Sequence, residues 1–237
     1  MQGFLKMISL LWVLLSFTAG CREQRKQIPG ILPPREVQPA RQVRMPEINS
    51  LPDTAFVRLS DYSPDFSYDL RYATSHNFME EAVYDCPKCY TRVKTARALI
   101  AANREFMDKG VRIRFFDCYR PNSVQYRMWE IVPNPQYVAN PRKGSIHNRG
   151  GAVDITLETL EGTPLDMGTD FDFFGKRAYH DNRDLPQKIL DNRSLLRETM
   201  EKYGFSSVRT EWWHYNLKAA YSYPVADFRW PCSMESP

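Results

Sequence analysis

The sequence is poor in histidine and glycine, and it lacks a long apolar run and a block of basic residues. Only four of its 237 residues are histidine and 11 are glycine, and no segment repeats. The longest apolar run, residues 7 to 17, is too short to cross about 30 Å of hydrocarbon as a helix. Residues 46–237 contain 25 basic and 26 acidic residues, so their net charge is close to zero. Nucleic acid is therefore not an expected partner. A content of 43% hydrophobic residues excludes a wholly disordered chain.

The first 21 residues have the pattern of an export signal. A single positive charge at Lys6 is followed by the apolar run, then by the small residues Thr18, Ala19 and Gly20. Cys21 comes next, and this ending resembles the lipobox of bacterial lipoproteins, in which the cysteine is lipidated and becomes the mature N-terminus. We therefore expect a lipoprotein signal peptide at residues 1–20 and a protein exported to the bacterial periplasm and anchored to the membrane through Cys21. Plain secretion is the alternative.

Residues 21–52 have the composition of an extended tether. Six prolines and six basic residues occur in this stretch, with almost no aromatic residues, so it cannot bury enough apolar surface to fold. We expect a lipidated cysteine and a Pro-rich basic tether here, and a folded catalytic domain at residues 53–237.

Four further cysteines favour disulfide bonds, because an exported protein meets an oxidising compartment. They are Cys86, Cys89, Cys118 and Cys232. The spacing of Cys86 and Cys89 is also found in zinc ribbons and in redox proteins, but a single pair is weak evidence for either. Four cysteines allow three pairings, and the sequence does not choose among them.

The hydrophobic pattern predicts an α+β fold, with a small, mostly antiparallel sheet and helices packed against it. Helical spacing of apolar residues predicts helices over residues 91–109, 123–131 and about 189–203. Alternation predicts strands over residues 57–59, 68–72, 111–115, 151–157 and 208–217. Residues 133–143 contain three prolines and are expected to form a loop.

Two of the four histidines lie near acidic residues in a pattern typical of zinc sites. His147 precedes Asp154 by seven residues, and His214 follows Glu211 by three. Two imidazoles and one carboxylate are a usual zinc set that leaves a fourth position for water. We predict a zinc site on His147, Asp154 and His214, with Glu211 as the general base for a water that the metal activates. The remaining histidines, at positions 76 and 180, are expected to be structural.

The spacing of Glu211 and His214 poses a geometric difficulty. On a regular strand, residues three apart point to opposite faces of the sheet. If both belong to the site, a bulge or bend must lie between them, and bulges are common next to active sites.

Five separated segments resemble, in the same order, the motifs of the zinc D-alanyl-D-alanine dipeptidases of the VanX type. They are YATSHNF at 72–78, DCYRP at 117–121, S-x-H-x-x-G-x-A-x-D at 145–154, MGTDFDF at 167–173 and E-x-W-H at 211–214. The resemblance covers roughly residues 55 to 230. It implies a D,D-peptidase or hedgehog-like fold with one zinc ion per chain on the sheet. It also implies hydrolysis of D-Ala-D-Ala to two D-alanines.

The resemblance assigns roles to four more residues. It implies that Arg120 stabilises the oxyanion, that Asp172 with Tyr72 nearby holds the substrate ammonium, and that Ser145 holds the substrate carboxylate. Two features depart from the family pattern. Cys118 stands where the family usually has glycine, and residues 79–90 differ from the family's glycine-containing segment.

Three alternatives to the dipeptidase are considered. One is a D,D-carboxypeptidase acting on peptidoglycan stem peptides. Another is a non-catalytic lipoprotein that binds the cell wall; the presence of both Glu211 and Arg120 disfavours it. The third is a thiol redox protein using Cys86 and Cys89.

Overall fold

The structure, a computed structural model, describes residues 45–232. The expected signal peptide, Cys21 and residues 22–44 of the expected tether lie outside the described residues.

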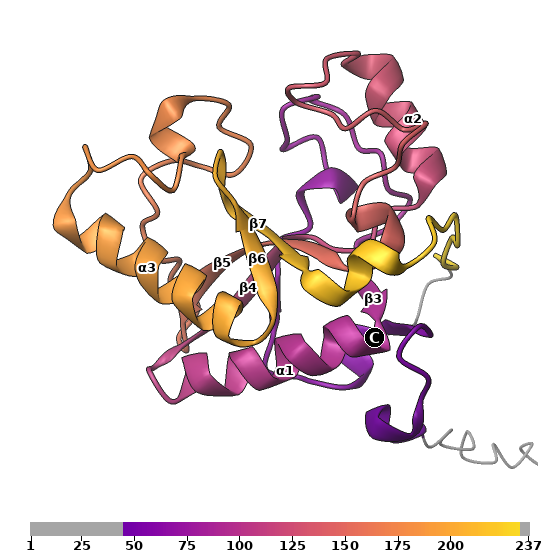
Figure 1. Cartoon of the computed structure of the whole chain (residues 1–237), viewed down its shortest axis with the longest axis horizontal. Helices are drawn as coiled ribbons and strands as arrows, with labels where there is room; N and C mark the ends of the chain where they lie inside the picture. Colours follow the sequence, from indigo (N-terminus) through magenta and orange to yellow (C-terminus); the bar gives the residue numbers. More distant parts are fainter. Residues whose placement is uncertain (1–44, 233–237) are drawn as a thin grey trace, which may run out of the picture. The chain divides into compact units, whose positions relative to one another are not determined.

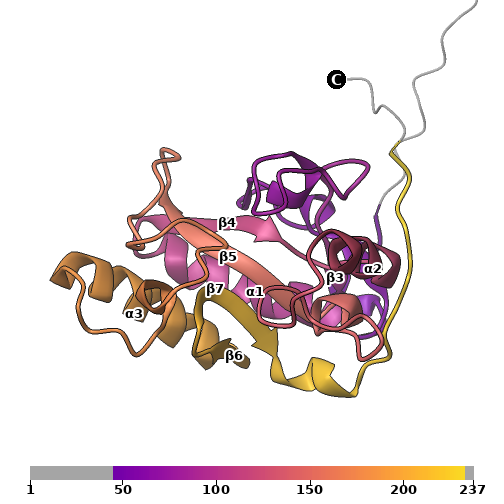
Figure 2. The same cartoon turned by 90° about the horizontal axis from the view of Figure 1, so that it is seen from above.

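A five-stranded sheet with strand order β2-β4-β5-β7-β6 forms the centre of the fold (Figures 1 and 2). Its strands are β2 (Ser67–Tyr68), β4 (Val111–Asp117), β5 (Ala152–Thr159), β6 (Phe205–Val208) and β7 (Glu211–Leu217). β2 pairs with β4 in parallel, and the other pairs are antiparallel. A separate antiparallel ribbon joins β1 (Phe56–Arg58) to β3 (Tyr90–Arg92). The predicted small, mostly antiparallel sheet is confirmed.

Three α-helices accompany the sheet: α1 (Val93–Met107), α2 (Asn122–Ile131) and α3 (Gln187–Lys202). The apolar stripe of α1, with Ala96, Leu99 and Phe106 fully buried, packs against the core. Helices α1 and α3 are neighbours, and α2 lies on the side of the molecule away from α3 (Figure 1). The α+β class is therefore confirmed. Within residues 45–232, no helix has the length and apolar character needed to span a membrane.

Strand β5 separates the core from the face that holds the polar site residues. Val153, Ile155 and Leu157 are fully buried in the hydrophobic core. Because side chains alternate along a strand, Asp154 points to the opposite face. The alternation expected from the sequence thus places one carboxylate on the polar face of the sheet.

Two predicted strands are wrong in their extent. The strand expected at 68–72 ends at Tyr68, and Arg71–Ala73 instead forms a 3-10 helix. The strand expected at 208–217 begins only at Glu211, as β7, and Val208 instead ends the preceding strand β6, with which β7 forms a hairpin. The local sequence contains no turn signal there, because Arg209 and Thr210, which connect the two strands, are not residues that favour turns such as glycine, proline, asparagine or aspartate.

The folded domain begins earlier than expected, so the last residues of the expected tether are not extended. Ile48–Ser50 forms a 3-10 helix. The Arg97 guanidinium on α1 donates to the backbone oxygens of Ile48 and Leu51 at 2.8 Å each. The sequence did not predict this contact, because it depends on a side chain nearly 50 residues away.

The four cysteines form two disulfide bonds, Cys86–Cys232 and Cys89–Cys118. Cys86 and Cys89 are thus bonded to distant cysteines rather than to each other. The expected structural disulfides are confirmed, and the pairing argues against a redox function of the Cys86–Cys89 motif.

Candidate metal centre and its cavity

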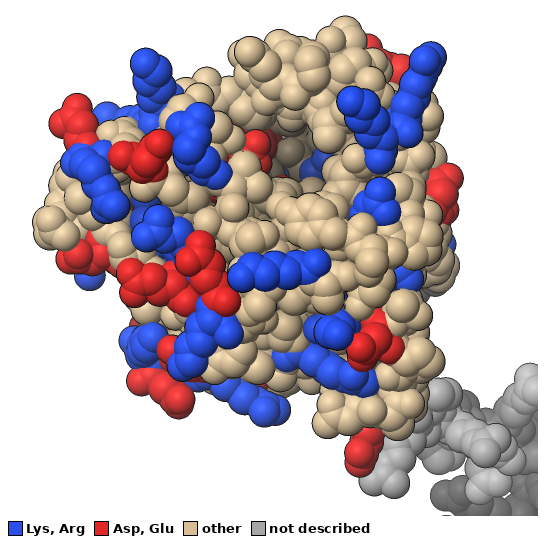
Figure 3. Space-filling model, viewed as in Figure 1, with Lys and Arg blue, Asp and Glu red and all other residues tan. Residues whose placement is uncertain are grey.

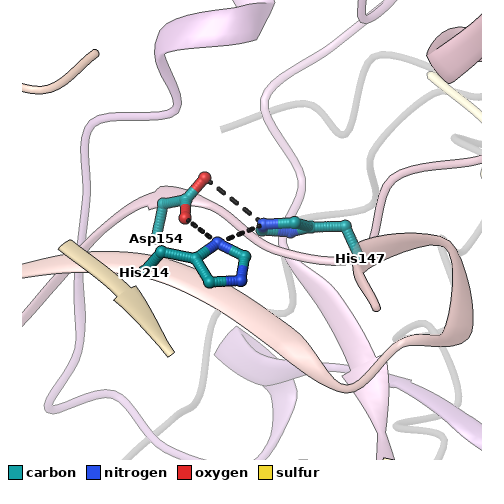
Figure 4. A group of neighbouring side chains, drawn as sticks. All are labelled: His147, Asp154 and His214. Carbon is teal, nitrogen blue, oxygen red and sulfur yellow. Dashed lines mark hydrogen bonds and ion pairs between the residues drawn. The ribbon is translucent and has the colours of Figure 1, made fainter. Parts of the chain in front are cut away.

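Three predicted zinc ligands converge at one point above the sheet. Asp154 on β5 lies directly opposite His214 on β7 in the antiparallel register. His147 begins a 3-10 turn, His147–Arg149, that precedes β5. Its Nε2 atom lies 3.4 Å from the Asp154 carboxylate and 3.2 Å from Nδ1 of His214, which is 2.9 Å from that carboxylate (Figure 4). One ligand atom from each residue lies within 4.8 Å of the others.

The glycine after this turn allows it to pack closely. Gly150 has a φ of +70°, a left-handed conformation, and a Cβ atom there would lie 2.6 Å from the Phe56 ring. Glycine adopts this conformation without a steric cost. The glycine of the S-x-H-x-x-G string thus places His147 near β5.

The hydrogen bonds of the two imidazoles leave their lone pairs facing each other. Nδ1 of His147 lies 2.7 Å from the Cys118 carbonyl oxygen, which can only accept, so this nitrogen carries the proton. Nε2 of His214 lies 2.9 Å from Oδ1 of Asn216, which assigns the proton to that nitrogen in the same way. The neutral imidazoles therefore each turn a lone pair toward the Asp154 carboxylate, where a cation can be held between them. This donor set fits a divalent cation, and the outward hydrogen bonds are those that orient metal-ligating histidines.

The electrostatics of the cluster agree with this conclusion. Burial acts against a charged imidazole, but Asp154 outweighs it and raises the pKa of His214 to about 9. Burial likewise acts to raise the pKa of Asp154, yet the two imidazoles hold that pKa well below its ordinary value. The acidic Asp154 carboxylate therefore stabilises a positive charge placed between it and the two imidazoles.

A bulge in β7 brings Glu211 and His214 into the same cavity. Ser207 pairs with Tyr215, but the next residue of β6, Val208, pairs with Glu211. Between these two pairs, β7 has the additional residues 212–214, whereas β6 has none. The side chains of β7 therefore do not alternate regularly between the two faces of the sheet here. Of the alternatives that the spacing left open, the structure thus has an irregularity between Glu211 and His214. Oε2 of Glu211 lies 3.9 Å from Nδ1 of His214, and burial raises the pKa of the Glu211 carboxyl above its ordinary value.

Arg120 precedes α2 and is held by two buried partners. Its Nε and Nη2 atoms donate to Oδ2 of Asp117 at 3.1 and 2.6 Å, and Nη1 donates to Oε1 of Gln125 at 2.9 Å. Burial acts to lower the pKa of Arg120, but Asp117 and other nearby acidic groups raise it, so the guanidinium is charged. These bonds use three of its five N–H groups. The remaining N–H groups are available to the cavity that Arg120 lines.

Asp172 and Tyr72 form a pair on the other side of the cavity. The Tyr72 hydroxyl donates to the two carboxylate oxygens of Asp172 at 3.2 and 3.0 Å. Burial, followed by the charge of Asp154, raises the pKa of Asp172 well above its ordinary value. A cation arriving beside this carboxyl would lower its pKa again. The pair is therefore suited to a positively charged group.

All eight predicted site residues within residues 45–232 line one cavity of about 230 Å³. They are Tyr72, Arg120, Ser145, His147, Asp154, Asp172, Glu211 and His214. His76 and His180 are not among its lining residues. On the face shown in Figure 3, the surface is hollowed between α2 and the segment preceding α3, with charged side chains at its bottom.

Sequence reasoning missed the residues that orient the site. Asp117 and Gln125 hold Arg120, and Asn216 holds His214. Asn216 lies two residues after His214, so strand periodicity could have identified it. Gln125 gave no such signal, because its role depends on how α2 packs beside the Arg120 segment.

Comparisons with known proteins identify the family to which the chain is similar. The peptidase M15 family, described as D-Ala-D-Ala dipeptidase, matches residues 53–231. A D-alanyl-D-alanine dipeptidase of Escherichia coli is 34% identical over 179 residues, covering 76% of this chain and 93% of that protein. One of Enterococcus faecalis is 30% identical, covering 70% and 92%. A crystal structure of a mutant of the vancomycin resistance D,D-pentapeptidase VanY with Zn(II) has a TM-score of 0.37 at 17% identity, covering 56% and 77%.

Proposed function

The chain belongs to the D-Ala-D-Ala dipeptidase family of metallopeptidases, and from this we propose that it hydrolyses the dipeptide D-Ala-D-Ala to two D-alanines with one zinc ion per chain. The observation that supports this most directly is the meeting of two imidazole lone pairs and a carboxylate beside Glu211 and Arg120 in one cavity. A structural metal site would have no need of a base and a guanidinium next to it.

His147, Asp154 and His214 would hold the zinc ion. When bound, zinc supplies Lewis-acid activation of water and of the peptide carbonyl. The Cys118 carbonyl and Asn216 fix the two imidazoles so that their lone pairs point inward. The protein therefore contributes a preformed ligand set.

Glu211 and Arg120 would carry out the proton transfer and the charge stabilisation. Glu211 takes a proton from the attacking water and delivers it to the leaving amine, and the raised pKa of its buried carboxyl makes it a stronger base for the uptake. Arg120, fixed by Asp117 and Gln125, directs its remaining N–H groups at the oxygen that becomes negative. A preorganised charge in a secluded site is a large catalytic contribution.

Three other residues would restrict the substrate to a dipeptide. Asp172 with Tyr72 binds the free ammonium, and Ser145 binds the free carboxylate. A longer or N-acylated peptide would leave the Asp172 carboxyl buried without its charged partner, which disfavours binding.

Turnover of three substrates tests this function. The purified protein loaded with zinc should release D-alanine from D-Ala-D-Ala, and should act far more slowly on N-acetyl-D-Ala-D-Ala and on L-Ala-L-Ala. Equal or faster cleavage of the acetylated substrate would instead identify a D,D-carboxypeptidase. Zinc binding without any turnover would favour a cell-wall-binding lipoprotein.

We also propose that the protein is exported and anchored in the membrane through a lipid on Cys21. Two disulfide bonds support an oxidising compartment such as the periplasm. Labelling cells with a radioactive fatty acid should mark the protein and leave a C21A variant unlabelled. An unlabelled wild-type protein in the periplasmic fluid would support plain secretion.

A further inference from the structure

The buried hydroxyl of Tyr84 contacts the carboxylate that holds Arg120. It donates to Oδ1 of Asp117 at 2.6 Å. Tyr84 is 7% exposed and Asp117 is fully buried, so water does not compete for this bond. Burial, and then the charge of Asp117, raise the pKa of Tyr84 well above its ordinary value, so the hydroxyl keeps its proton.

The two oxygens of Asp117 have separate partners. Oδ1 accepts from the Tyr84 hydroxyl and from the backbone N–H of Cys118, at 2.6 and 2.8 Å. Oδ2 accepts both bonds from Arg120. The donors on Oδ1 therefore fix the rotation of the carboxylate, and that rotation determines where Oδ2 and the Arg120 guanidinium lie.

The segment that carries Tyr84 is held firmly in place. The backbone N–H of Tyr84 donates to the Tyr72 carbonyl at 3.0 Å, and its ring packs against Trp230 with ring centres 5.6 Å apart. Disulfide bonds attach Cys86 and Cys89 of the same segment to distant parts of the chain. Tyr84 thus has little freedom to move away from Asp117.

We propose that Tyr84 is a positioning residue for the dipeptidase reaction, acting through Asp117 to aim Arg120 at the developing oxyanion. The proposal rests on the function proposed above. Hydrogen bonding from Tyr84 also draws negative charge toward Oδ1. Asp117 then neutralises Arg120 less completely, and more of the positive charge is available to the cavity.

This role predicts an effect on the transition state rather than on substrate binding. In a Y84F variant, kcat should fall about tenfold, which matches the loss of one hydrogen bond to a charged group. The KM for D-Ala-D-Ala should stay within about twofold. A phosphinate analogue of the dipeptide, which presents a tetrahedral anion to Arg120, should bind about tenfold more weakly.

A Y90F variant is the matched control. Tyr90 lies on the same segment, and its ring also packs against Trp230, with ring centres 5.3 Å apart. Y90F should keep kcat and phosphinate affinity within about twofold of wild type. Zinc content and the melting temperature of both variants show whether the fold and the metal site are intact.

A double-mutant cycle on phosphinate affinity separates positioning from a general structural role. If Tyr84 acts through Arg120, Y84F should have no further effect in an R120A background. An equal loss of affinity in both backgrounds overturns the proposal. So does a Y84F protein that loses zinc, or one whose KM changes while kcat does not.

The same experiments distinguish this inference from the proposed function. A wild-type protein without dipeptidase activity contradicts the function itself. An active wild type with an equally active Y84F variant contradicts only the role of Tyr84.

Discussion

At the scale of single residues, Glu211 is expected to act in proton transfer and not in holding the metal. A Glu211→Gln variant keeps the size of the side chain and one accepting oxygen but cannot take up a proton from water. We expect kcat to fall by about 100-fold or more, with zinc still bound at the wild-type stoichiometry. Steady-state turnover and metal analysis of the purified variant test this. Undiminished turnover would exclude Glu211 as the base.

Asp172 is expected to determine recognition of the free amino terminus. In an Asp172→Asn variant the carboxyl charge is lost while the hydrogen bond from Tyr72 can remain. We expect the KM for D-Ala-D-Ala to rise by about tenfold or more, and the slow cleavage of the N-acetylated dipeptide to change little. Comparing kcat/KM for the two substrates measures the effect. A proportional loss for both would show that Asp172 does not bind the ammonium.

At the scale of elements, a charged contact joins α1 to α3 and should make stability depend on pH. Oε2 of Glu105 on α1 accepts from Lys202 at 2.6 Å and from Tyr203 at 3.0 Å. Lys202, then Lys109 and Tyr203, lower the pKa of Glu105 to about 2 from an ordinary value of 4.5. Because the folded pKa is the lower one, this stabilisation is present above pH 4.5 and is lost as the pH falls toward 2.

A Glu105→Gln variant should therefore be less stable than wild type near neutral pH, and the difference should shrink between pH 4.5 and 2. Urea unfolding at a series of pH values measures this. The same substitution at Glu198, an exposed residue of α3, is the control and should leave the pH dependence unchanged. A pH-independent difference for Glu105→Gln would point to lost packing instead of lost charge.

At the scale of the whole molecule, the Cys86–Cys232 disulfide joins positions 146 residues apart. A bond of this kind restricts the unfolded chain, and the restriction grows with the length of the closed loop. A C86A/C232A variant should unfold with a free energy lower by about 2–4 kcal/mol. Urea unfolding under non-reducing conditions tests this, and the Cys89–Cys118 disulfide remains in place. An unchanged free energy of unfolding would show that the packing of residues 223–232 already holds this segment in place without the disulfide.

That packing has its own contacts near the site. Ala226 donates its N–H to the carbonyl of Asn148, and its own carbonyl accepts from the N–H of Asn122. Ala226 thus joins the segments that follow both His147 and Arg120. Stability and site geometry are connected at this scale, although the residues lie far apart in the sequence.

The sequence by itself determined the elements whose signal is local. The helical stripe predicted α1 to within two residues at each end, and alternation along β5 placed Asp154 on the face opposite the core. The candidate metal ligands and Glu211 were predicted from residue chemistry and spacing, and for Glu211 and His214 the spacing left open an irregularity in the strand, which the register contains. These features depend on covalent geometry and side-chain chemistry over a few residues.

Only the tertiary structure decided which distant groups meet. The disulfide pairing, the β6–β7 hairpin and the packing of Ile48–Ser50 on α1 all depend on contacts between segments far apart in the chain. The hydrogen bonds from Tyr84 and Arg120 to Asp117 likewise form because packing brings their segments together. Residue types predict which chemistry a site can perform. The orientation of each catalytic group, however, depends on contacts between distant segments that form only in the complete fold.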